Sequence, residues 1–133
     1  FFLDPAAPDG SPEPDPAVFE SGFEREVYRC IRARGYRVTP QVKVGPYRID
    51  LVVEGAGARL AVECDGDHWH GPEQFERDQA RQRVLERSGW VFFRVRGGAF
   101  YLDPDDALGG LWPLLDRLGI APEGAARPPV AAG

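Results

Sequence analysis

The sequence predicts an α/β fold in which a mixed β-sheet of about four strands is flanked by helices. Two observations lead to this prediction. Segments in which apolar and polar residues alternate, as they do in half-buried strands, stand next to segments with apolar residues at helical spacing. These segments follow one another in the order helix, three strands, helix, strand, helix, and such an interleaved order is typical of α/β domains.

The first helix is expected to begin near Ser21. Ser21 and Glu24 have the spacing of a capping box, in which the two side chains bind the free backbone N–H groups of the first turn. Apolar residues at helical spacing follow, and Gly35 is the expected stop. Glu24 lies beside the apolar stripe, so its role is either the cap alone or a part in a nearby site.

A second helix is expected over about 73–88, with Phe75 and Leu85 on its inner face. A third is expected over roughly 104–118, where Pro113 should kink or break it, because proline lacks the N–H group and crowds the preceding turn. The predicted strands cover residues 36–44, 47–53, 60–65 and 90–95.

Length and composition fit one folded domain. A chain of 133 residues with 43% hydrophobic residues can bury one core but not two. Residues 1–17 hold five prolines and four acidic residues, which predicts a linker or disordered arm, and residues 121–133 predict a disordered tail. We therefore expect a single domain over residues 18–120. Because the sequence contains no methionine, we expect it to be a piece of a longer chain.

The sequence predicts a cytoplasmic protein without a membrane partner. No apolar run approaches the roughly 18 residues of a membrane span. The first residues lack the basic and then apolar pattern of a signal peptide. Cys30 and Cys64 lie far apart, which is typical of free thiols in a reducing compartment.

The charge pattern permits a nucleic-acid partner. A net charge of −5 argues weakly against phosphate binding. However, 14 of the 16 basic residues lie within residues 25–96, and arginine is dense over residues 77–96. The middle of the chain can therefore present a basic face.

Two of the strands are expected to pair as a hairpin whose register is set by the hydrophobic pattern. When Val53 pairs with Leu60, the apolar residues of both strands share one face. Asp50 then lies opposite Glu63. In this register Asp50, Glu63 and Asp65 share the other face, which predicts three carboxylates within a few ångströms of each other.

Three carboxylates this close need a compensating cation or raised pKa values. Oxygen-rich clusters suit Mg²⁺ or Mn²⁺, and such an ion supports phosphodiester hydrolysis. The alternative is that Asp50 and Glu63 simply face solvent on an antiparallel sheet. The acidic and histidine-rich string CDGDHWHG follows Glu63 at the end of its strand, where α/β proteins place their sites, and this favours a metal site.

A resemblance makes this hypothesis more specific. Three consecutive strings together resemble PD-(D/E)XK restriction-endonuclease-like domains. They are RIDLVV, then LAVECDG followed by WH, and then RDQARQRVLERSGW leading into a strand with VR near its end. The similarity is to the very-short-patch repair endonuclease type, often fused to the C-termini of superfamily 1 DNA helicases. It covers about residues 19–105, with Gln41 at a usual Gln position. The residues that match its pattern are Glu24, Asp50, Glu63, Asp65, His70, Asp78 and Arg81.

The resemblance implies a restriction-endonuclease-like core and a Mg²⁺- or Mn²⁺-dependent endodeoxyribonuclease, with DNA and the other domains of a longer, helicase-type chain as partners. Asp50, Glu63 and Asp65 are the expected metal ligands, Glu24 a further site residue, and His70 the group that assists proton transfer. The expected DNA-backbone contacts are Arg77, Arg81 and Arg94, whose alternative role is in ion pairs with neighbouring acids.

Two other interpretations stay open at this point. The wider superfamily has lysine at the position of Asp65, so the domain is alternatively a catalytically weak or inactive module for DNA docking or assembly. A zinc site from Cys64, Asp65, His68 and His70 is disfavoured, because Cys64 falls on the core face of the predicted hairpin and the paired spacings of zinc motifs are absent.

Overall fold

The computed structural model describes residues 14–66 and 71–123. A single 3-10 turn, η1, precedes the first helix. The elements are η1 (Pro16–Val18), α1 (Gly22–Ala33), β1 (Arg37–Val44), β2 (Tyr47–Gly55), β3 (Ala58–Asp65), α2 (Pro72–Arg87), β4 (Phe92–Arg96), α3 (Gly97–Leu102), α4 (Pro104–Ala107) and α5 (Leu111–Arg117).

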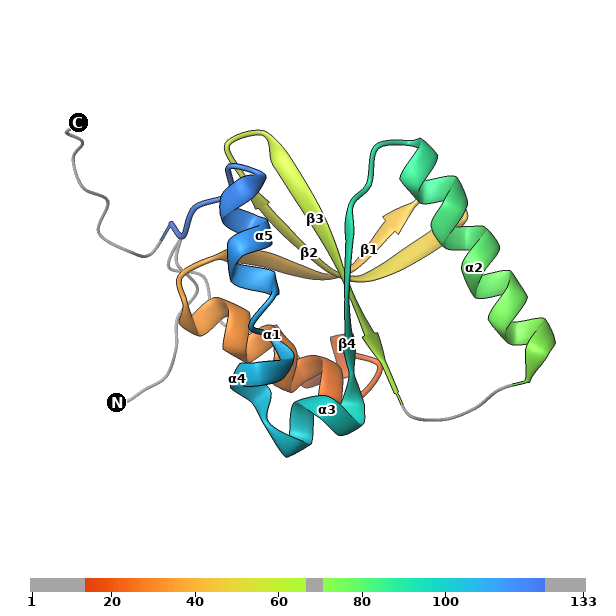
Figure 1. The fold of residues 1–133 in the computed structure, drawn as a ribbon, viewed down its shortest axis with the longest axis horizontal. Helices are drawn as coiled ribbons and strands as arrows, with labels where there is room; N and C mark the ends of the chain where they lie inside the picture. The colour runs from red at the N-terminus through yellow and green to blue at the C-terminus, as the bar shows by residue number, and fades with distance from the viewer. Residues whose placement is uncertain (1–13, 67–70, 124–133) are drawn as a thin grey trace.

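The strands form one mixed sheet in the order β1-β2-β3-β4. Strand β2 lies antiparallel to both β1 and β3, and β4 lies parallel to β3. Helix α2 connects β3 to β4 and covers one side of the sheet, whereas α1, α3, α4 and α5 lie on the other side (Figure 1). The predicted fold class, a mixed four-stranded sheet flanked by helices, is confirmed.

Two apolar cores hold these layers together. The larger one lies between the sheet and the four-helix side, where Val27 and Ile31 of α1 meet Leu111 and Leu115 of α5. The smaller one lies under α2 and is formed by Ile49, Val52, Ala61, Leu85 and Trp90. Leu85 is the one buried residue of α2, so this helix is fixed to the sheet near its C-terminal end.

The start of α1 has a capping box in which the second bond is shifted by one residue, from the Ser21 N–H to the Glu20 N–H. The Ser21 Oγ accepts a hydrogen bond from the Glu24 backbone N–H at 3.2 Å. The Glu24 side chain turns back and accepts from the backbone N–H of Glu20 at 3.0 Å. Both bonds satisfy donors that have no partner inside the helix. They also hold the Glu24 carboxylate next to Glu20.

The predicted register of β2 and β3 is confirmed, because Val53 pairs with Leu60. The predicted faces are wrong for the first part of β2. Leu51 and Val53 belong to the larger core, but Ile49 packs into the smaller core on the opposite side of the sheet. The strands turn over at this point, where Gln41, across from Asp50 in β1, has a φ of +52°. Alternation cannot anticipate such a turnover.

The C-terminal region differs from the single kinked helix that was expected. Helix α3 was not predicted, and the rest divides into α4 and α5. The break falls at residues 109–110, both glycine, and not at Pro113. Pro113 lies in the first turn of α5, where the missing N–H has no helical partner to lose.

Phe75 is a second departure, because it was expected on the inner face of its helix. Its side chain is 54% exposed, while Leu85 on the same helix is 2% exposed. The reason is that residues 72–77 of α2 stand clear of the sheet and only the later turns cover it.

We predict that Leu85→Ala lowers the free energy of unfolding by about 2–5 kcal/mol, because it leaves a cavity in the smaller core. Val84→Ala is the matched control: Val84 is the neighbouring residue, 42% exposed, and its loss should change stability by less than about 0.5 kcal/mol. Urea unfolding followed by circular dichroism measures both. Equal effects of the two substitutions would contradict this placement of α2.

Candidate active site

The candidate site lies where β2 and β3 separate. Their paired residues run from Gly55 and Ala58 at the turn to Leu51 and Val62. Beyond that pair, the Asp50 backbone N–H donates to Glu63 Oε2 at 3.3 Å. The Cys64 backbone N–H donates to Asp50 Oδ2 at 2.9 Å. Two carboxylates thus accept hydrogen bonds that main-chain carbonyl groups accept elsewhere in the ladder.

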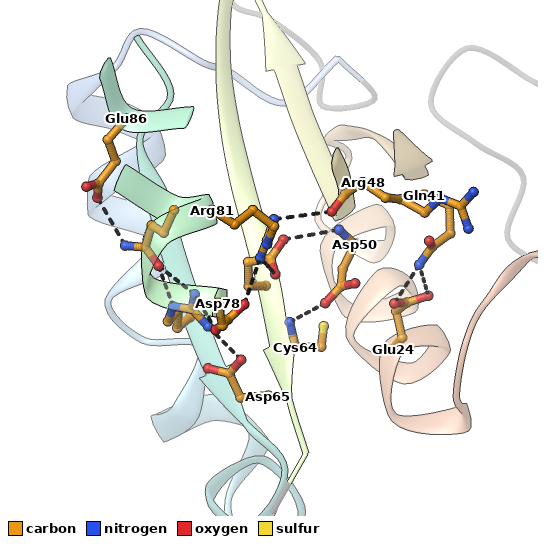
Figure 2. Close-up of polar contacts among 12 residues, drawn as sticks. Glu24, Gln41, Arg48, Asp50, Cys64, Asp65, Asp78, Arg81 and Glu86 are labelled. Atoms are coloured by element: carbon orange, nitrogen blue, oxygen red, sulfur yellow. Dashed lines mark hydrogen bonds and ion pairs between the residues drawn. The ribbon is translucent and has the colours of Figure 1, made fainter. Parts of the chain in front are cut away.

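Helix α1 brings a third carboxylate to this point. Glu24 is 2% exposed, and both its oxygens accept from the Gln41 amide Nε2, at 3.0 and 2.9 Å. Figure 2 shows Glu24 facing Asp50 from α1, on the side away from Arg81. Gln41 Oε1 is itself buried and has no hydrogen-bond partner among the described residues.

One group of oxygens in the described part of the chain is close enough to share an ion. Glu20, Glu24 and Asp50 each offer a carboxylate oxygen, and these oxygens lie within 4.8 Å of one another. The sequence had placed Asp50 with Glu63 and Asp65 instead. Glu20 was missed, because the capping pattern predicts that Glu24 binds the Ser21 N–H, whereas in the structure it binds the Glu20 N–H.

Glu63 and Asp65 face α2 and are paired with arginines. Arg81 Nη2 lies 2.6 Å from Glu63 Oε1, and Arg94 Nη1 lies 2.7 Å from Asp65 Oδ1. Asp78 joins both pairs, at 3.3 Å from each arginine (Figure 2). Asp65 is therefore drawn toward β4, whose Arg96 lies beside it in the parallel register.

The three arginines expected to hold DNA fall into two classes. Arg81 and Arg94 form ion pairs with neighbouring acids, and their contact with DNA stays a prediction. The acids are Glu63, Asp65 and Asp78, as the preceding contacts show. Arg77 donates to the neutral Gln74 side chain at 3.0 Å, at an exposed position. Its charge is therefore the least compensated of the three.

Burial changes the protonation of the carboxylates. It raises the pKa of Glu24 to about 7 from an ordinary 4.5. Burial, and then the charge of Asp50, raise the pKa of Glu63 to about 7 as well, although Arg81 opposes the shift. Burial likewise raises the pKa of Asp50. These carboxyl groups therefore keep their protons to a higher pH than ordinary carboxyl groups do.

The thiol and the guanidinium beside these acids keep their ordinary charge. Burial raises the pKa of Cys64, so its thiol stays protonated. Cys64 packs against the larger core, as expected for a side chain on that face. Burial acts to lower the pKa of Arg94, but Asp65 and Asp78 outweigh it and hold the pKa above its usual value.

The donor set fits a hard divalent cation. All the converging ligand atoms are carboxylate oxygens, which Mg²⁺ and Mn²⁺ prefer. Within the described chain, the donors on Glu24 and Asp50 are neutral: the Gln41 amide and the backbone N–H groups of Glu20 and Cys64. These hydrogen bonds therefore add no positive charge beside Glu24 and Asp50, whereas Glu63 is bound by Arg81.

Some expected site residues lie outside the described part of the chain. These are His68 and His70, so the role of His70 stays a prediction. The zinc alternative needs the same histidines and also stays untested. Among residues 14–66 and 71–123, no helix has the length and apolar character needed to cross a membrane.

Comparison with known proteins places the chain in a family. A search of curated proteins found no match to it. The family model REase_MTES_1575, of restriction endonuclease-like domains, matches residues 23–115, which is more than half of the chain. This range begins in α1, ends in α5 and includes the whole sheet with Glu24, Asp50 and Glu63. The chain therefore belongs to the restriction endonuclease-like family REase_MTES_1575.

Proposed function

We propose that this domain is a metal-dependent endodeoxyribonuclease that hydrolyses phosphodiester bonds in DNA. The observation that carries the proposal is the convergence of Glu20, Glu24 and Asp50 oxygens within 4.8 Å, next to the point where Asp50 binds Glu63. Membership of a restriction endonuclease-like family supports it. The raised pKa values of Glu24 and Glu63 also support it, because a bound cation would favour their ionised forms.

In this proposal Asp50, Glu63 and Glu24 hold Mg²⁺ or Mn²⁺, with Glu20 and Asp65 as further candidate ligands. The ion would polarise the phosphate and lower the pKa of the attacking water. The protein prepares the ligands in advance. Gln41 holds both oxygens of Glu24, and the Cys64 N–H holds Asp50. Because these donors are fixed by the sheet, little reorganisation is needed when the ion binds.

The remaining roles are also proposals. His70 is our candidate for proton transfer, since an unperturbed histidine titrates near pH 6.5. Arg77 is our first candidate for a DNA phosphate contact, because its described partner is a neutral amide. Arg81 and Arg94 would first have to exchange a carboxylate for a phosphate. We further propose a cytoplasmic setting, on the pattern of the two cysteines, and a longer, helicase-type parent chain, on the sequence resemblance alone.

A second candidate function is a DNA-docking module without catalysis. The observation that favours it concerns Asp65, which stands at the position where the superfamily has lysine. Asp65 supplies no positive charge there and is itself bound in an ion pair with Arg94. Calorimetric titration with Mn²⁺ separates the two functions. A nuclease binds the ion and loses it with Asp50→Asn, whereas a docking module binds DNA but takes up no ion.

We predict that Asp50→Asn and Glu63→Gln each reduce cleavage at least about 100-fold, because each removes a charged ligand while keeping the side-chain shape. The assay is nicking of supercoiled plasmid with Mg²⁺ or Mn²⁺, and EDTA should abolish it. Asp116→Asn is the control, since Asp116 is an exposed acid on α5. Unchanged cleavage by the Asp50 variant would remove this residue from the metal site.

We also predict that, without metal, stability falls as pH rises from 4.5 to 7. Over this range the folded protein keeps protons on Glu24 and Glu63 that the unfolded chain releases. The free energy of unfolding should fall by on the order of 1–3 kcal/mol for each carboxylate. Thermal melting in EDTA at pH 5 and pH 8 measures the loss.

Glu24→Gln is the matched variant for this pH dependence, because it removes one of the titrating groups. Its melting temperature should depend less on pH than that of the wild type. Added Mn²⁺ should raise the wild-type melting temperature more at pH 8 than at pH 5, since the ion binds ionised carboxylates. An equal metal effect at both pH values would show that these carboxylates are not the ligands.

A further inference from the structure

A cleft leads away from the acidic site along α2. It has a volume of about 570 Å³, and its lining residues come from the N-terminal half of α2 and from the ends of β3 and β4. Glu20 and Cys64 form part of its wall. Glu20 belongs to the converging carboxylates, and the Cys64 N–H holds Asp50, so the cleft is continuous with the proposed metal site.

Phe75 supplies an aromatic surface inside this cleft. It lies on the same helical face as Asp78 and Gln79, three and four residues later, and all three line the cleft. Asp78 on this face binds Arg94 of β4, which fixes the direction in which the face points. The Phe75 side chain is nevertheless 54% exposed. The ring therefore stands at the edge of a polar cleft and is not buried in a core.

We propose that the cleft seats one unpaired base of a DNA strand whose phosphate lies at the acidic site. This inference rests on the proposed nuclease function. The base stacks on the Phe75 ring, a contact that any base can make. The Gln79 amide, which offers both donors and an acceptor, meets the edge of the base. Arg96 is an exposed residue of the cleft lining and has no ion pair with another described residue. Its guanidinium meets the neighbouring phosphate.

The size and polarity of the cleft select this occupant. Its volume lies in the range of pockets that enclose one drug-sized molecule, which is the size of a nucleotide and not of a base pair. Arg94 in the lining is already bound by Asp65 and Asp78, which compensate its charge and leave little attraction for a buried phosphate. A neutral base with amino groups can donate to the remaining lone pairs of these acids. A base inside the cleft has left its partner strand. The domain should therefore prefer single-stranded or gapped DNA to an intact duplex.

The first test compares substitutions on α2 by fluorescence anisotropy, with a 12-nucleotide labelled single strand in EDTA. Phe75→Ala should weaken binding about 5- to 150-fold, the range for loss of one base–aromatic stack. Phe75→Trp should keep the affinity. Val84→Ala is the control, because Val84 is an exposed apolar residue on the same helix outside the cleft lining. Equal affinities for the Phe75→Ala and Val84→Ala variants overturn the proposal.

The second test locates the base directly. Single strands that carry one 2-aminopurine at different positions should show quenching of its fluorescence in the wild type, and Phe75→Ala should abolish this quenching. Quenching at no position, or equal affinity for an intact duplex and a single strand, overturns the cleft proposal. If the wild type still cleaves plasmid in that case, the nuclease assignment stands. If the wild type neither binds nor cleaves DNA, both proposals fail together.

Discussion

The structure depends on the exchange of hydrogen bonds between β2 and β3 where the two strands separate. Asp50 accepts from the Cys64 backbone, and Glu63 accepts from the Asp50 backbone. These bonds continue the pairing of the strands after the main-chain ladder has ended. They also tie the position of each carboxylate to the backbone of the other strand. A site built on paired strands in this way is held more rigidly than one built on a loop.

The two sides of the sheet treat the acidic charge differently. On the α2 side, Arg81 and Arg94 neutralise the carboxylates of β3 directly. On the α1 side, Gln41 and backbone groups bind Glu24 and Asp50 without adding a positive charge. Burial raises the pKa values of Glu24, Asp50 and Glu63, and Arg81 opposes this shift at Glu63 without cancelling it. The proposed cation would supply beside Glu24 and Asp50 the positive charge that Arg81 supplies beside Glu63.

Sequence reasoning recovered the parts of the fold that local patterns encode. Alternation fixed the pairing of Val53 with Leu60, and spacing identified the capping box of α1. It failed where distant segments decide the outcome. The face of Ile49 depends on the turnover at Gln41, which alternation does not record. The position of Glu20 beside Asp50 depends on how α1 packs against the end of β2, which no single segment contains.

The attachment of α2 combines one buried leucine with two ion pairs to the sheet, Arg81–Glu63 and Asp78–Arg94. Apolar burial and ion pairing respond differently to dissolved salt, because mobile ions screen charges but leave the hydrophobic contact intact. The side chains of Asp78 and Arg94 are 35% and 25% exposed, so mobile ions reach this pair. The side chains of Arg81 and Glu63 are only 16% and 7% exposed, so salt screens their pair less. Raised ionic strength therefore weakens the contact at Asp78, in the lining of the cleft, while Arg81 and Leu85 keep the helix on the sheet.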